Sequence, residues 1–150
     1  MTLYMETTKV AAEKTAREIT ELLARAGASA VQTEYKERKI IAMSFMYEVK
    51  GEKIPFRLPV RSDSLFIYFQ NKRDSWNRSS RAEKDREQAD RVAWRQIYRW
   101  IQAQLALLDT GMVEMPEIFL PYIQTGVDET LYQRLEAGNF KALPAPVEAP

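Results

Sequence analysis

A basic, serine-rich segment near the middle of the chain carries the residues best suited to binding an anionic polymer. Residues 70–82 read QNKRDSWNRSSRA and show no helical or alternating periodicity, so we expect a flexible loop. Its basic and aromatic side chains are Lys72, Arg73, Trp76, Arg78 and Arg81. Ammonium and guanidinium groups neutralise phosphates, and an exposed indole can stack on an unpaired base. The alternative is a solvated loop whose tryptophan folds back onto the nearest apolar patch.

Two further sets of arginines follow the spacing of a strand and of a helix. In residues 54–61, IPFRLPVR, apolar residues alternate with Pro55, Arg57, Pro59 and Arg61, which indicates an edge or interrupted strand. Farther along, Arg91, Arg95 and Arg99 repeat every four residues and form one stripe of a helix. Both sets offer positive charge to phosphate groups. The alternative for the strand arginines is charge that protects an edge strand. For the stripe, the alternatives are a solvated helix face or ion pairs with Glu34, Glu37 or the acidic C-terminal region.

A third pattern raises the possibility of magnesium-dependent nuclease chemistry. Glu48-Val49-Lys50 matches the Glu-x-Lys of restriction-type nuclease cores, and Glu34 is the candidate for the earlier carboxylate. Carboxylates hold magnesium there, and the lysine helps to activate water. Two features oppose this interpretation: Lys50 precedes Gly51 in a turn, and the first 62 residues contain no aspartate. We therefore rank the nuclease last and name no catalytic or metal-binding residue.

The amino-acid composition excludes several classes of catalytic and metal-binding site. The chain has no histidine and no cysteine, so a structural zinc site and a Ser/His or Cys/His nucleophile are excluded. There is no phosphate-binding glycine loop among the five glycines, and we expect no cofactor. The sequence shows neither a membrane span nor a secretory signal, so we expect a cytoplasmic protein without membrane association.

The net charge of +1 conceals an asymmetry between the two parts of the chain. Residues 111–150 hold 2 basic and 6 acidic residues, which leaves 20 basic and 15 acidic in residues 1–110. A body of charge +5 and an end of charge −4 favour an anionic partner for the body.

The elements that must position these residues form an α+β pattern. Residues 12–26 predict a helix that ends at Gly27, and residues 81–110 predict a long amphipathic helix that ends at Gly111. The expected strands are residues 31–35, 39–49, 54–61 and 65–69, with a further short one at 3–10, and a last helix is expected from Asp128 to Ala137. We expect one α+β domain over residues 1–140, with a small antiparallel sheet of three to four strands. The N-terminal helix and the long helix pack on one face of that sheet. Residues 141–150, rich in proline and alanine, are expected to be a disordered tail.

Three blocks of the sequence support a resemblance. They are AEKTAREITELLARAGA (12–28), IPFRLPVR (54–61) and ADRVAWRQIYRWIQAQLALLDTGMVEMPEIFLPYI (89–123). In combination they resemble a group of small, uncharacterised proteins encoded by bacteriophages and prophages, over roughly residues 10–135. The resemblance implies the cytoplasm of a bacterial host and an accessory role, and it carries no catalytic residues.

The leading hypothesis is a non-catalytic accessory protein that binds DNA or RNA through the basic residues named above. The alternative is a module that binds or inhibits a host or phage protein, with an exposed Trp100 as one sign of it. The oligomeric state is left open.

Overall fold

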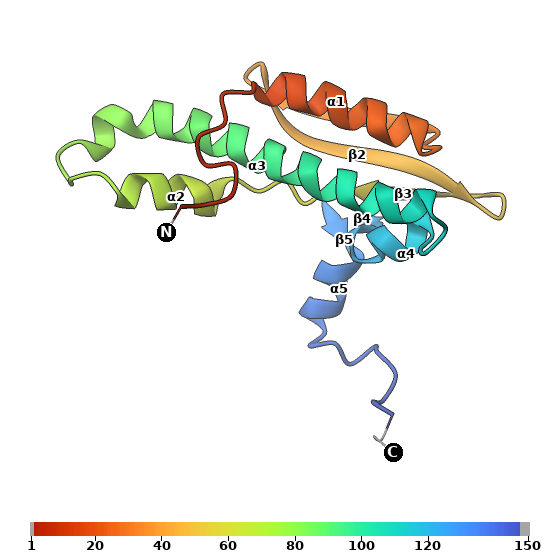
Figure 1. Ribbon diagram of the computed structural model, residues 1–150. Coiled ribbons are helices and arrows are strands. Elements are labelled where there is room, and N and C mark those ends of the chain that lie inside the picture. Colours follow the sequence, from red (N-terminus) through yellow and green to blue (C-terminus); the bar gives the residue numbers. More distant parts are fainter. Residues whose placement is uncertain (1, 148–150) are drawn as a thin grey trace.

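The computed structural model describes residues 2–147 (Figure 1). Its helices and strands, in chain order, are α1 (Ala12–Arg25), β1 (Ala30–Lys36), β2 (Lys39–Val49), β3 (Glu52–Arg57), α2 (Asp63–Asn71), α3 (Arg78–Asp109), α4 (Met115–Phe119), the 3-10 turn η1 (Leu120–Tyr122), β4 (Gln124–Gly126), β5 (Glu129–Thr130) and α5 (Leu131–Ala137). The α+β class, the N-terminal helix and the long C-terminal helix are therefore confirmed. No helix within residues 2–147 is long and apolar enough to cross a membrane.

The main sheet is antiparallel, in the order β1-β2-β3, and a separate two-stranded sheet joins β4 to β5. Alternation along β2 places Met43 and Phe45 on the inner face, where both are buried. Phe45 stacks on Phe56 of β3 at a centroid distance of 5.0 Å, and Phe119 meets Phe45 edge-on at 5.3 Å. α1 contacts the sheet and α3 runs along α1 (Figure 1), so the apolar stripes of both helices close the core over this inner face.

The long helix continues well beyond the sheet and pairs there with α2. The two form an antiparallel helical hairpin that projects from the sheet-bearing body (Figure 1). Residues 65–69, LFIYF, belong to α2, so the strand expected there is wrong. A short apolar run is compatible with a strand or with a buried helix. The helix forms here because the segment packs against α3, which follows it in the chain.

One further expected strand is absent, and three boundaries differ from the sequence-based expectation. Residues 3–10 form turns and extended chain without a strand, because no sheet edge lies beside them to supply backbone partners. β3 ends at Arg57, and α3 begins at Arg78 rather than Arg81. The last helix starts after Thr130, whose hydroxyl accepts a hydrogen bond from the Gln133 amide, and Asp128 lies in the preceding turn with φ of 56°. In the expected tail, residues 141–147 contain no helix or strand, and residues 148–150 lie outside the described residues.

A buried threonine in α1 leads to a first prediction. Thr15 is fully buried, and its hydroxyl has no hydrogen-bond partner among the described residues. Thr15→Val keeps the shape and removes the cost of burying that hydroxyl, so we expect the free energy of unfolding to rise by about 1 kcal/mol. Denaturant titration measures the change. Thr20→Val is the matched control, because the Thr20 hydroxyl donates to the Ala16 carbonyl (2.9 Å) and its removal brings no such gain.

Candidate nucleic-acid interface

The tip of the helical hairpin presents the most exposed tryptophan of the described chain. The expected loop 70–82 is mostly helical: α2 runs to Asn71 and α3 starts at Arg78, so only residues 72–77 connect them. Trp76 lies in this connection and is 78% exposed, which excludes the interpretation in which it folds onto an apolar patch. Arg78 and Arg81 follow it on the first turn of α3, and both are exposed. The indole and the two guanidinium groups therefore belong to one small protruding surface, which we call the tip.

The tip is closed by reciprocal hydrogen bonds between the two helices. Arg78 Nε donates to the Gln70 carbonyl oxygen (3.1 Å), and Gln70 Nε2 donates to the Arg78 carbonyl oxygen (3.1 Å). Arg78 Nε is thus committed to the turn, and the Arg78 side chain is exposed. These bonds fix the start of α3, the helix that carries both Arg78 and Arg81.

Below the tip, a buried carboxylate holds the hairpin together. Asp85 of α3 is 3% exposed, and Arg73 donates to it twice, from Nη2 to Oδ1 (2.9 Å) and from Nε to Oδ2 (3.3 Å). Gln70 Nε2 donates to Oδ2 as well (2.9 Å). The Arg73 hydrogen bonds, with a smaller contribution from Gln70, hold the pKa of the Asp85 carboxyl below its ordinary value despite burial. We call Asp85, Arg73 and Gln70 the latch. Arg73 therefore acts between the helices, and it is only about one-third exposed.

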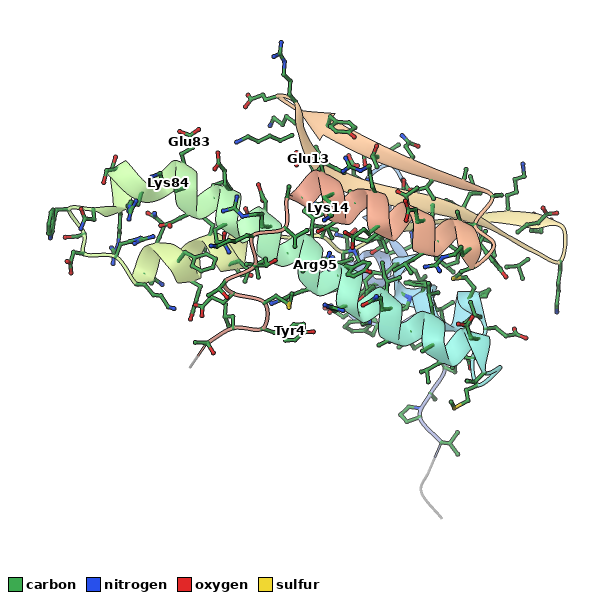
Figure 2. All side chains as sticks on the ribbon, turned by 45° about the horizontal axis from the view of Figure 1, so that its top comes forward. Tyr4, Glu13, Lys14, Glu83, Lys84 and Arg95 are labelled. Carbon is green, nitrogen blue, oxygen red and sulfur yellow. The ribbon has the colours of Figure 1, made fainter. Side chains whose placement is uncertain are left out.

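The N-terminal segment ties Lys72 to the body of the molecule. Lys72 Nζ contacts Glu6 Oε1 at 2.5 Å, and this contact, with Tyr68, lowers the pKa of the Glu6 carboxyl and raises the pKa of the Lys72 amine. Gln88 of α3 donates to the Glu6 and Thr8 carbonyls (2.8 and 3.0 Å) and holds the same segment on the helix. Tyr4, in the same segment, lies beside α3 (Figure 2). Lys72 is thus a paired cation at the edge of the tip.

Arg57 and Arg61 lie on another part of the molecule, with the sheet. Arg57 Nη1 contacts Glu34 Oε2 at 2.6 Å on the outer face, and Asp128 lies 3.7 Å from Arg57 Nη2. The charge of Arg57 therefore stabilises the pairing of β1, β2 and β3 across the sheet. Arg61 lies beyond the end of β3, is exposed, and has no ion pair among the described residues.

The three arginines of the α3 stripe contact different partners. Arg95 points toward α1 and contacts Glu18 Oε2 at 2.9 Å, and its side chain is only 12% exposed (Figure 2). Arg91 donates twice to Gln88 Oε1 (2.9 and 2.6 Å), and Arg99 donates to Gln102 Oε1 (3.0 Å). Within residues 2–147 the stripe forms no ion pair with Glu34, Glu37 or an acidic residue of the C-terminal region; its central arginine, Arg95, pairs with Glu18 of α1.

The residues considered for magnesium chemistry do not converge. Glu34 stands opposite Ala42 on β2, whereas Glu48 is six residues farther along β2 and opposite Lys53. At 3.3 Å per residue the two carboxylates are about 20 Å apart along the sheet. Lys50 lies in the β2–β3 turn with φ of 51°. Within residues 2–147, no group of three or more acidic residues is arranged to hold a metal ion.

Two features of the interface escaped sequence analysis. The sequence does contain a signal for the latch. Asp85 precedes Ala89 and Val92 at the spacing of the buried face of the helix, and an acidic residue on a buried face indicates a buried partner for its carboxylate. Gln88 carries no such signal, since its partners are backbone carbonyls of the distant residues 6 and 8.

The fold and the tip define a small α+β protein with an outward helical hairpin, basic at its end and bearing an exposed indole. No family model, no curated protein and no solved structure matches the chain.

Proposed function

We propose that this chain is a non-catalytic accessory protein that binds single-stranded nucleic acid through the tip. The observation that carries the proposal is the 78% exposure of Trp76 beside the exposed Arg78 and Arg81. Exposing an indole to water is unfavourable unless a partner covers it, and a neighbouring pair of guanidinium groups favours an anionic partner.

The geometry favours single strands over duplexes. An indole stacks on the face of a base, and the bases of a duplex already have both faces covered by their neighbours. Arg78 and Arg81 lie within one turn of α3, close enough to contact phosphates that flank one stacked base. Ser79 and Ser80 add exposed hydroxyl groups in the same turn.

The proposal narrows the set of ten residues considered from the sequence. Arg57, Arg73 and Arg95 are held by acidic side chains, and Lys72 is held by Glu6. Arg91 and Arg99 lie on α3 itself but farther from the hairpin end, and Arg61 lies between β3 and α2. The phosphate contacts are therefore assigned to Arg78 and Arg81, with Lys84 one turn farther along α3 (Figure 2) as a third cation.

The resemblance to phage-encoded proteins supports a biological setting. In this proposal the protein acts in the cytoplasm of an infected bacterium, as an accessory to DNA or RNA metabolism.

Fluorescence anisotropy with labelled oligonucleotides tests the function. We expect single-stranded DNA or RNA to bind more tightly than a duplex of the same length. The logarithm of the association constant should fall with the logarithm of salt concentration, with a slope of about −1.5 to −2 for two to three phosphate contacts on a single strand. Binding that does not respond to salt, or no binding at 50 mM salt, contradicts the proposal and leaves Trp76 as an anchor for a protein partner.

A further inference from the structure

The two edge strands of the three-stranded sheet, β1 and β3, differ in whether their outer backbone groups can pair with another strand. On β3, Pro55 has no amide hydrogen to donate, and Phe56 is bridged to Ile123 at the start of the β4 region. On β1, the sequence AVQTEYK contains no proline, and the register shift beside Glu34 and Tyr35 comes from an extra residue in β2, Ile41. β2 is the only strand paired with β1 within residues 2–147. One edge is blocked, and the other keeps a regular row of backbone donors and acceptors.

The inner face beside the open edge is also incompletely covered. Met43 and Phe45 of β2 are 0% and 3% exposed, but their neighbours Thr33 and Val31 on β1 are only half-buried. Tyr35 at the end of the strand is 59% exposed. A surface groove runs here between α1 and β1; its lining includes Ala16, Thr20, Val31, Thr33 and Tyr35. The inner surface of the sheet therefore extends farther than the helix that covers it.

We propose that a second copy of this chain occupies this edge, with the two β1 strands paired antiparallel about a two-fold axis at Thr33. The two sheets would become one continuous six-stranded sheet, and the interface would be isologous. This inference does not depend on nucleic-acid binding, because it uses neither Trp76 nor the cations of the tip.

The sequence of β1 is complementary to itself in this register. Val31 stands opposite the partner's Tyr35 on the inner face, an aromatic and β-branched pair of the kind that stabilises antiparallel sheets. On the outer face Gln32 stands opposite the partner's Glu34. Arg57 occupies Glu34 Oε2, so Oε1 is left to accept from the glutamine amide. No two like charges face each other along the strand, and Lys36 stands opposite alanine.

The expected dimer is reversible. Seven paired residues extend about 23 Å, and a single strand pair with the adjoining groove lies at the small end of specific interfaces, below about 1,200 Å². Dimer formation should therefore depend on concentration over the micromolar to millimolar range rather than being permanent.

Charge substitutions on the proposed axis give a specific test. Thr33 faces its own copy, so Thr33→Lys and Thr33→Glu each place two like charges together, and each variant alone should be monomeric. Because the groove is open, either side chain can reach water and the fold should survive. Mixing the two variants in equal amounts places lysine opposite glutamate and should restore a dimer. Sedimentation velocity over a concentration series measures the species, and circular dichroism reports the fold.

Thr110→Lys is the matched control, because Thr110 is exposed at the far end of α3 and its substitution should leave the dimer intact. Three results would overturn the proposal. They are a wild-type chain that is monomeric up to 1 mM or so, a dimer that persists in both folded Thr33 variants, and folded variants that are monomeric alone and remain so when mixed.

Discussion

Replacing Asp85 by alanine is expected to lower the free energy of unfolding by about 2–3 kcal/mol. The carboxylate is 3% exposed and accepts three hydrogen bonds, two from Arg73 and one from Gln70. Its loss leaves the two Arg73 donors without an acceptor on the inner side of the hairpin, and Gln70 Nε2 keeps only its hydrogen bond to the Arg78 carbonyl oxygen. Breaking a fully buried pair costs about 3–5 kcal/mol, and the lower figure applies because Arg73 is about one-third exposed and can turn toward water.

Urea denaturation monitored by circular dichroism measures the effect. Asp109→Ala is the matched control: Asp109 is an exposed aspartate at the end of the same helix, so its change should stay within about 0.5 kcal/mol. If Asp85→Ala costs no more than this control, the latch does not stabilise the hairpin.

The same carboxylate predicts how stability depends on pH. Because the pKa of Asp85 is lowered in the folded state, its contribution is complete above the ordinary aspartate pKa, and it is lost as the pH falls through the lowered value. Asp85→Asn cannot titrate, so the difference in unfolding free energy between wild type and Asp85→Asn should shrink toward acidic pH. A difference that stays constant from neutral to strongly acidic pH would show that Asp85 is not ionised in the folded protein.

Replacing Trp76 by alanine is expected to weaken single-strand binding by about 5- to 150-fold. Stacking of one base on an aromatic side chain contributes about 1–3 kcal/mol, and each 1.4 kcal/mol is a factor of ten in the dissociation constant. The anisotropy titration of the wild type is repeated with the variant at fixed salt. Trp76→Phe keeps an aromatic face and should retain part of the affinity.

Two properties of the structure allow a loss of binding in Trp76→Ala to be assigned to the Trp76 side chain itself. Trp76 is 78% exposed, so its removal should leave the unfolding free energy within about 0.5 kcal/mol of wild type. Trp94 is 2% exposed, and Trp100 is half-buried, edge-on to Phe119 and Tyr122. Quenching of exposed indole fluorescence by a bound base therefore reports Trp76. Equal affinities of the wild type and the alanine variant would remove Trp76 from the interface.

Single substitutions distinguish the contribution of the tip arginines to binding from that of the other arginines. Arg78→Gln and Arg81→Gln should each reduce the magnitude of the salt slope by about 0.7, the value expected for one phosphate on a single strand. Arg57→Gln is the matched control, since Arg57 is held by Glu34 on the sheet. A loss of slope in Arg57→Gln equal to that in the tip variants would place the binding surface on the sheet instead.

Much of the fold was predictable, because its elements have strong local signals. The apolar residues of the long helix from Trp94 to Leu108 have helical spacing, so a helix was predicted there. β2 and β3 are rich in apolar, β-branched and aromatic residues, so strands were predicted there. The error at residues 65–69 has a physical cause. The five residues are all aliphatic or aromatic and show no alternation, so the packing of α2 on α3 decides their conformation.

The candidate site was less predictable than the fold. The sequence by itself determined that positive charge accompanies a tryptophan at residues 72–81, and that histidine and cysteine chemistry is absent. Only the tertiary structure decided which cations are paired: Arg73 with Asp85, Arg57 with Glu34 and Arg95 with Glu18. These pairs span 12 to 77 residues of chain, so no local spacing reveals them. A charge is available to a ligand only if the fold leaves it unpaired, and that depends on which elements pack side by side.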